Sequence, residues 1–564
     1  MNVRSAVAPS AAILLAACGL AHATGTHTTI ALTGTDGALG PNAGPGITFS
    51  TIGGQQPGVN SNGQVVFRAS DSTANNPQGV YIHSGGVNSN VALAGGAQPG
   101  GGTFTMGSNS IFNSMQINAS GQWAFRLGAS TGLFASVAGT PTRAMLTGDA
   151  APGAGGANYS SSASGMPLFN NAGHIGYIAN LAVNAASSPP VVITSGIANA
   201  AAIWTGTPGA TSIALRQNDA VLSLDAGGNV RVGSFQNLSL SMNGNGHFAV
   251  ISNLQGSVTT GTGAGSNSAM ISSNRSGSLE VIARVGNAAP DATGAASSDL
   301  YRALGTSAVG FNNVGHVAFA SSLRNAAGTQ TASSALFTDS GSGTLRMVAR
   351  NGDLLPSISG AIGSEFDGVT WGTFSNTYLT GSDTLAFSAT IGNTGGSGNT
   401  NVLMTMDASG AFHRVVRSGD VAIVDGAPLG GDARFTSFSN ITVNAASQMA
   451  FSATLNGNGI FGGPGGNNNA IFGYDPAGGL FLLARTSDAF EVAPGDLRII
   501  SSIGGLSSTG GQDGRVTSLS ENGKIALSLD FSDGSSGVFL FTIPAPASLS
   551  LLSFAGLVGL RRRR

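Results

Sequence analysis

A short unit recurs eight times along the 564-residue chain, and this recurrence limits the folds open to it. In most copies an Asn stands three residues before a Gly, and an apolar run follows. The copies are spaced by about 50–75 residues, which suits one supersecondary unit each. The residues at the centres of the eight apolar runs are Phe67, Phe125, Tyr177, Val250, Phe319, Phe387, Phe451 and Leu527.

Each copy has the sequence features of four short strands. A first strand, as at residues 47–49 or 516–519, precedes the Asn, and the apolar run is the second. The Asn side chain can bond its own backbone two residues on, and the Gly accepts positive φ, so the two residues predict a turn between these strands. Third and fourth strands follow, as at residues 335–337 and 348–353. Four short strands per unit are typical of a β-propeller blade.

The two ends of the repeat region supply complementary parts of one blade. The last copy has three strands and no fourth, whereas residues 28–36 resemble the fourth-strand segment at 143–149. Pairing these ends would remove the exposed sheet edges of an open array. We therefore predict an all-β fold over residues 28–542. It is an eight-bladed β-propeller of four-stranded blades, closed by an N-terminal strand that joins the last blade.

The charge content excludes one class of partner. Charged residues make up 9% of the chain, and the 23 basic residues are balanced by 25 acidic ones. Four of the basic residues are the last four of the chain. No basic face remains to neutralise phosphates, so we expect no nucleic-acid binding.

Residues 1–23 have the pattern of a signal peptide. A short basic start is followed by an apolar core at 11–17, and Ala21 and Ala23 are the small residues that a signal peptidase reads. The only cysteine, Cys18, ends a segment that also resembles a bacterial lipoprotein lipobox. Removal of Cys18 with the signal and lipidation of Cys18 both stay open. In either case the protein is exported and has no disulfide.

Residues 543–564 resemble a PEP-CTERM sorting signal, which combines a Pro-Glu-Pro box, a hydrophobic helix and an arginine cluster. Pro544 and Pro546 flank Ala545, which stands where Glu is usual, and an apolar stretch covers residues 549–560. The arginine cluster consists of Arg561, Arg562, Arg563 and Arg564. The resemblance implies cleavage by an exosortase in the inner membrane of a Gram-negative bacterium, followed by display at the cell surface or in the extracellular matrix.

The tail also has a physical limit as an anchor. Its roughly 12 apolar residues are fewer than the roughly 20 that span a bilayer, so we expect a short hydrophobic helix that anchors only transiently, with its arginines in the cytoplasm. Membrane contact is expected through the terminal segments alone. The repeats themselves resemble the tandem Asn-x-x-Gly proteins that often carry such tails, with Asp383 and Ser447 departing from the Gly position.

Two recurring polar patterns invite a catalytic or metal-site hypothesis. His174, His247 and His316 follow the motif Gly in three successive copies. Equivalent positions in neighbouring blades lie too far apart for the roughly 2.0–2.1 Å Zn–N distances of shared ligation, so we predict polar turn residues and no metal or cofactor. Arg-x-x-Asp recurs four times, at 216–219, 350–353, 417–420 and 485–488, which favours a repeated turn ion pair or cap over catalysis.

The sequence leaves two functional hypotheses. The favoured one is a non-enzymatic propeller scaffold at the cell surface or in the matrix that binds exopolysaccharide or surface proteins. Long polar insertions at 184–199, 255–268 and 456–469, and Trp371 as an exposed ligand platform, are its candidate contacts. The alternative is an extracellular propeller hydrolase or lyase acting on polysaccharide. A glycosidase needs two carboxylates about 5–9.5 Å apart, and no acidic cluster interrupts the repeat.

Overall fold

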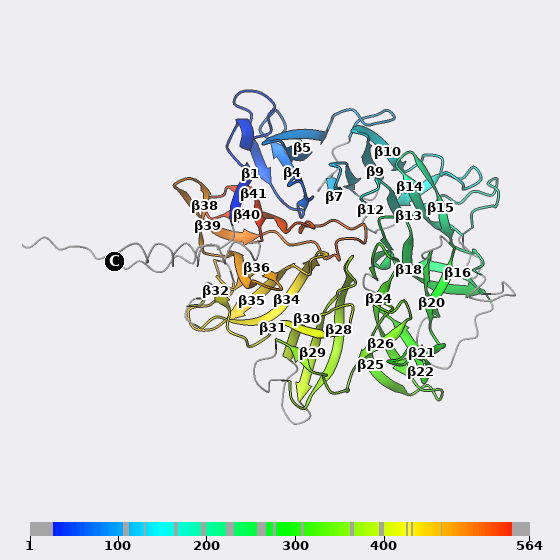
Figure 1. Cartoon of the computed structure of the whole chain (residues 1–564). Helices are drawn as coiled ribbons and strands as arrows, with labels where there is room; N and C mark the ends of the chain where they lie inside the picture. The colour runs from blue at the N-terminus through cyan, green and yellow to red at the C-terminus, as the bar shows by residue number, and fades with distance from the viewer. Residues whose placement is uncertain are drawn as a thin grey trace, which may run out of the picture.

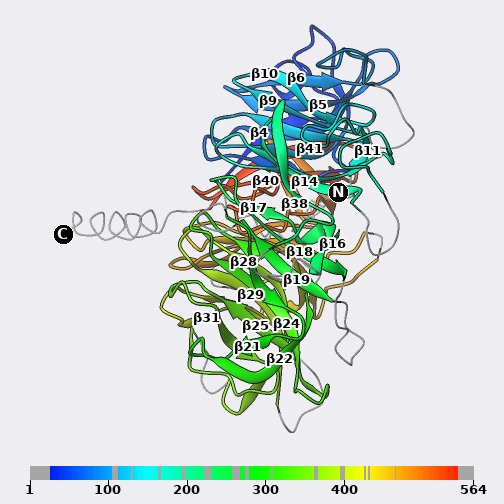
Figure 2. The same cartoon turned by 90° about the vertical axis from the view of Figure 1, so that its right-hand side faces the viewer.

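The computed structural model describes residues 26–104, 112–128, 131–162, 167–192, 199–221, 230–256, 267–273, 278–305, 309–360, 366–393, 400–424, 427–429, 432–463 and 465–543. Within them, eight antiparallel blades stand around a central axis (Figure 1). Figure 2 shows the same ring turned by 90°. The predicted all-β, eight-bladed propeller is therefore confirmed.

The first four blades have the following strands. Blade one contains β2 (Phe49–Ile52), β3 (Gly58–Val59), β4 (Val65–Asp71), β5 (Gln78–Ser84) and β6 (Val87–Leu93). Blade two contains β7 (Phe112–Ile117), β8 (Trp123–Leu127), β9 (Gly132–Val137) and β10 (Thr140–Leu146). Blade three contains β11 (Tyr159–Ser162), β12 (Leu168–Phe169), β13 (Ile175–Leu181), β14 (Ala201–Thr207) and β15 (Ala210–Arg216). Blade four contains β16 (Val230–Phe235), η3 (Asn237–Ser239), β17 (Ser241–Met242), β18 (Phe248–Gly256), β19 (Ser268–Ser272) and β20 (Glu280–Arg284).

The last four blades follow the same order. Blade five contains β21 (Ala288–Pro290), β22 (Ala296–Leu304), β23 (Gly310–Phe311), β24 (Val317–Arg324), β25 (Gln330–Thr338) and β26 (Arg346–Arg350). Blade six contains β27 (Ile358–Ser359), β28 (Val369–Leu379), β29 (Leu385–Asn393), β30 (Thr400–Met406) and β31 (Phe412–Arg417). The hairpin β32 (Ile423–Val424) and β33 (Ala427–Pro428) leads to blade seven, with β34 (Arg434–Val443), β35 (Met449–Asn456), β36 (Asn469–Asp475) and β37 (Gly479–Arg485). Blade eight contains β38 (Ala489–Ala493), β39 (Asp496–Ile503), β40 (Lys524–Phe531) and β41 (Ser536–Thr542).

The first strand of the chain belongs to the last blade. β1 (His27–Leu32), which precedes η1 (Gly37–Leu39), pairs antiparallel with β41, with Thr28 opposite Leu540 and Thr29 opposite Phe539. The sheet order is β1-β41-β40-β39-β38. The last blade thus combines strands from both ends of the described chain.

The strand order gives the ring two different faces. The Asn turns join the first and second strands of each blade and lie on the face that we call the turn face. The links between second and third strands, and those leading to the next blade, lie on the opposite face because consecutive strands run antiparallel. The insertion at 456–469 joins β35 to β36 and so belongs to the opposite face, where Phe461 is 57% exposed.

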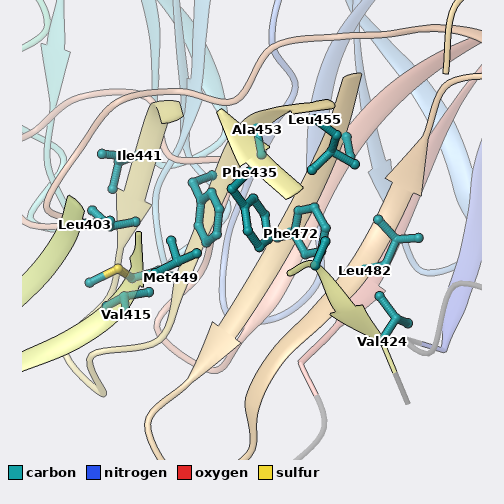
Figure 3. Packing of buried hydrophobic residues seen from close by; sticks show 14 of the residues in the cluster. Leu403, Val415, Val424, Phe435, Ile441, Met449, Ala453, Leu455, Phe472 and Leu482 are labelled. Atoms are coloured by element: carbon teal, nitrogen blue, oxygen red, sulfur yellow. The ribbon is translucent and has the colours of Figure 1, made fainter. Parts of the chain in front are cut away.

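The hydrophobic core is divided into layers between neighbouring blades. The central aromatics were predicted to be buried there, and Phe67, Phe125, Phe319, Phe387 and Phe451 are at most 3% exposed. The residue before each aromatic is small or aliphatic and packs on the aromatic of the next blade. Ala318, for example, shares a cluster with Phe387. Figure 3 shows part of the layer between blades six and seven, where Leu403 and Val415 of blade six lie near Met449 of blade seven.

The predicted terminal signals lie beyond these sheets. Residues 1–23 and residues 544–564, which include Pro544, Pro546 and Arg561 to Arg564, lie outside the described residues. Within the described ranges there is no helix of the length and apolarity needed to cross a bilayer.

Candidate functional site: the closed central channel

The central channel is crossed by a segment of the last blade. Residues 504–518 leave the end of β39, cross the middle of the ring and return to the turn before β40, as the orange segment in Figure 1 shows. We call residues 504–518 the plug. Residues 516–519 were predicted to be the first strand of this blade, and that prediction is wrong. The first strand is β39, and only Leu519 makes a bridge, to Ile525.

Backbone hydrogen bonds join the plug to blades one, three, four and seven. In four blades, the residue directly before the motif Asn donates its N–H to a plug carbonyl. These pairs are Val59 to Thr517 at 2.9 Å, Phe169 to Gly514 at 2.6 Å, Met242 to Asp513 at 2.9 Å and Val443 to Thr509 at 3.1 Å. The plug therefore lies level with the ends of the first strands, directly inside the ring of turns.

One charged pair holds the plug in shape. Asp513 is 2% exposed and accepts hydrogen bonds from the Thr509 hydroxyl at 2.6 Å and the Arg515 N–H at 3.1 Å. The Arg515 guanidinium lies 3.7 Å from the Asp513 carboxylate and donates to the carbonyls of Leu238 and Leu240 in blade four. A buried carboxylate with these partners stays compensated, and the arginine joins the plug to the segment between β16 and β17.

The motif asparagines form a hydrogen-bonded ring around the plug. The Asn243 Oδ1 accepts the N–H groups of Asn245 and His247, each at 3.0 Å, and so shapes its own turn. Its Nδ2 donates to the Asn312 carbonyl of the next blade at 3.1 Å. The same inter-blade bond runs from Asn60 to Asn118, Asn118 to Asn170, Asn170 to Asn243, Asn312 to Thr380 and Asn444 to Ser520.

Two blades lack the motif Asn. In both, a residue two positions after the motif position makes the hydrogen bond to the next blade. Where Thr380 replaces Asn, the Ser382 hydroxyl donates to the Ala445 carbonyl at 2.6 Å. Where Ser520 replaces Asn, the Asn522 amide donates to the Ser61 carbonyl at 2.5 Å. All eight blade junctions are therefore bridged on the turn face.

The histidines after the motif Gly belong to these junctions. The His316 Nδ1 lies 2.7 Å from the Asp383 carboxylate of the next blade. Asp383 keeps the left-handed backbone of the Gly that it replaces, with φ 62°. The His174 ring lies against Gly246 of the next blade, where a Cβ would stand 2.8 Å from Nδ1. Within the described part of the chain, no group of three or more His, Cys, Asp or Glu residues is placed to hold a metal ion.

The Arg-x-x-Asp pattern acts mainly as a cap. The Asp219 and Asp420 carboxylates each accept the backbone N–H of the arginine three residues earlier, at 2.6 Å. Arg485 and Asp488 form an ion pair at 2.6 Å. Arg350 differs, since its guanidinium pairs with Asp299 of the same blade at 2.6 Å.

Trp371 was predicted to be an exposed platform, and this is wrong. Its side chain is 2% exposed in β28 and packs against Phe374, Phe387 and Phe412 in the layer between blades five and six. A ring enclosed in this way is a core residue and has no free face for a ligand.

A cavity of about 200 Å³ remains in the channel beside the plug. Its walls combine aliphatic side chains with amides and hydroxyls, and Arg515 is the only charged residue among them. On the turn face, Glu521 lies beside a smaller pit. Burial raises the pKa of its carboxyl, and a hydrogen bond from the Ala445 N–H, at 2.8 Å, partly opposes that shift.

Sequence reasoning missed both the plug and the inter-blade bonds. The signal for the bonds was present in the repeated Asn, but its partner lies about one repeat away and becomes a neighbour only after the ring forms. The signal for the plug was the long separation between β39 and the last motif, 16 residues at 504–519 against seven at 53–59 in blade one.

Comparisons with known proteins give the following matches. The model of a family of unknown function (DUF7453) matches residues 15–132, 126–370 and 357–550. No curated protein matches the sequence. Among solved structures, the acylaminoacyl peptidase of Pyrococcus horikoshii matches with a TM-score of 0.37 and 6% identity over 77% of this chain and 52% of the peptidase.

Two further structures are similar at the same low level. Prolyl oligopeptidase B of Galerina marginata has a TM-score of 0.36 and 9% identity over 87% of this chain and 55% of that one. A polysaccharide lyase of family PL25, an ulvan lyase, has a TM-score of 0.28 and 10% identity over 92% of this chain and 96% of the lyase. The chain spans about half the length of the two peptidases.

Proposed function

Because the chain belongs to the DUF7453 family, whose description assigns no function, we propose a function from its own geometry. The protein is a rigid, non-catalytic scaffold, exported to the cell surface or the extracellular matrix, that binds exopolysaccharide or surface proteins. The observation that carries this proposal is the plug, because the chain's own residues 504–518 occupy the channel. A catalytic centre needs a concave site with convergent titratable groups, whereas the cavity beside the plug is lined mainly by amides, hydroxyls and aliphatic side chains.

The pairing of β1 with β41 supports the rigid-disc part of the proposal. We infer that this pairing closes the ring, since it gives the last blade its outer strand from the opposite end of the chain. A closed ring leaves only short, protected sheet edges and resists edge-to-edge aggregation. Such a disc suits long residence outside the cell, where the chain has no disulfide to stabilise it.

The route to the surface is the second part of the proposal. Residues 1–23 direct export, and an exosortase in the inner membrane cleaves the PEP-CTERM-like tail at 543–564. The Thr542 N–H donates to the Thr26 carbonyl at 3.1 Å, and the Ile543 N–H donates to the Gly523 carbonyl at 2.8 Å. Both chain ends therefore leave the disc together beside the turn face. A tether at Ile543 would hold the disc by that face and leave the opposite face free.

Sorting can be tested in a Gram-negative bacterium that encodes an exosortase and in a matched strain without it. Mass spectrometry of the recovered protein should show loss of the tail in the first strain and retention in the second. The double variant Pro544→Ala, Pro546→Ala should retain the tail in both strains, whereas the control Ser548→Ala should behave as the parent. The same C-terminal mass in all samples would reject sorting by exosortase.

A further inference from the structure

The cavity beside the plug lies on the inner side of the ring, away from the Asn turns. Its wall residues come several positions before the motif Asn in their blades, as with Gln56 before Asn60 and Asn440 before Asn444. The plug forms its floor with Leu506, Val516 and Arg515. The cavity therefore opens toward the face opposite the Asn turns and the chain ends.

The walls present two kinds of surface. Leu168, Leu240, Leu506 and Val516 supply aliphatic area, and Leu238 at the rim is 64% exposed. The polar groups are the amides of Gln56, Asn237 and Asn440, with the hydroxyls of Ser507 and Ser508. A few polar groups on a mostly apolar concave wall are the usual composition of a small-molecule site.

The residues that line and adjoin the cavity carry little uncompensated charge. The Arg515 guanidinium already donates to two carbonyls, and Asp513, 3.7 Å away, balances its charge. No acidic residue lines the cavity. A ligand recognised here must therefore be neutral and must use hydroxyl groups and apolar C–H surface.

The backbone directs one amide of the wall toward this space. Asn440 has φ 49°, a left-handed conformation that costs about 1–3 kcal/mol in a non-Gly residue. It lies in a bulge of β34 between Ser439 and Thr442, and bulges commonly re-aim side chains beside functional sites. Its amide makes one long hydrogen bond, 3.4 Å to the Ser452 hydroxyl. Within the described residues, the Gln56 side chain makes no hydrogen bond.

We propose that this cavity binds a single neutral sugar unit, as found at a chain end of an uncharged polysaccharide. A hexose has an apolar face of C–H groups and a rim of hydroxyls, which match the aliphatic wall and the amides of Gln56 and Asn440. The inference rests on the proposed scaffold function and names the ligand class for it. Because no aromatic residue lines the cavity, binding of one unit is weak, with a dissociation constant on the order of 1 mM.

The test is binding of methyl hexopyranosides to the purified protein, measured by calorimetry and by saturation-transfer NMR, with glucuronic acid as the charged comparison. Asn440→Gly removes the amide and keeps the left-handed backbone. It should weaken binding about tenfold, the cost of losing one or two hydrogen bonds. Asn376→Gly is the matched control, since Asn376 has φ 51° at the equivalent bulge of β28 and does not line this cavity.

The outcomes separate this inference from the scaffold function. Binding of a neutral hexoside that Asn440→Gly weakens and Asn376→Gly leaves intact supports the site. Binding equally affected by both variants, preference for glucuronic acid, or absence of binding to every hexoside overturns it. The sorting experiment on the tail is independent of all these results, so failure of the sugar site and failure of the exported scaffold are distinguishable.

Discussion

At the scale of single residues, the side-chain amide of the motif Asn makes hydrogen bonds both within its own turn and to the next blade. Its oxygen accepts backbone N–H groups within the turn, and its nitrogen reaches the carbonyl of the next blade. Ser and Thr can cap a turn, but their side chains are too short to make the second bond. At Thr380 and Ser520 the junction is bridged instead by Ser382 and Asn522, which donate to the carbonyl one residue later in the next blade.

We expect Asn243→Ala to lower the free energy of unfolding by about 1–3 kcal/mol, because Asn243 is fully buried and its loss leaves N–H groups and a carbonyl without partners. Asn245→Ala is the control. Asn245 also donates to blade five, at the Asn313 carbonyl, but it is exposed and water can replace it. Urea denaturation of both variants measures the difference. Equal effects would mean that the ring bonds contribute no more than surface bonds.

The raised pKa of Glu521 predicts a pH dependence. A carboxyl whose pKa is higher in the folded than in the unfolded protein favours folding most when it is protonated. Its contribution to the free energy of unfolding therefore falls as the pH rises from the unfolded-state pKa through the higher folded-state pKa. Glu521→Gln should remove this fall while its Oε1 still accepts the Ala445 N–H. Denaturation at pH 4 and pH 7 should therefore show the variant gaining stability relative to the parent at pH 7. A constant difference at both pH values would contradict the buried-carboxyl explanation.

At the scale of strands, blades pack through a repeated small-and-large pair. The residue before each central aromatic faces the following blade, and the aromatic faces the preceding one, so Ala249 meets Phe319 and Ala318 meets Phe387. Small residues let the sheets approach closely enough for the rings to be enclosed.

Phe319→Ala should cost about 3–5 kcal/mol of unfolding free energy, as is usual when a buried Phe leaves a cavity. Val314→Ala in the preceding turn, where Val314 is 49% exposed, should change stability by at most about 0.5 kcal/mol. Chemical denaturation of the two variants is the measurement, and a similar small effect for both would show that the layer relaxes around the lost ring.

The strands and their burial could be predicted because each repeat carries its own turn residues and its own alternation of apolar and polar residues. The blade count and the buried Phe67 and Phe451 followed from local pattern alone. Trp371 was misjudged because a first strand has one face in a blade layer, and the pattern around residue 371 does not say which face the indole takes. The cavity depends on side chains from several blades, which no local pattern brings together.

At the scale of the whole molecule, the plug connects blade eight to blades three and four, which are not its neighbours in the ring. Repeat arrays are stabilised mainly by nearest neighbours and lose cooperativity when one junction weakens. Hydrogen bonds from blades one, three, four and seven to a single segment add connections across the ring.

Replacing residues 504–518 by residues 53–57, the short link of blade one, should therefore lower the thermal midpoint by several degrees and broaden the transition. Deleting residues 461–463, which are exposed, is the control and should leave the midpoint nearly unchanged. Calorimetry distinguishes the two. An unchanged, equally sharp transition in the plug variant would show that neighbouring contacts alone make the ring cooperative.

The position of the plug in the chain also sets a time order for assembly. Seven blades are synthesised before residues 504–518 exist, and β41, the partner of β1, comes later still. Until then the first strands lack the hydrogen bonds that the plug accepts, and β1 contacts blade one but has no strand of its own blade to pair with. A nascent chain therefore cannot form the plug bonds or the pairing of β1 with β41 until its last blade has been synthesised.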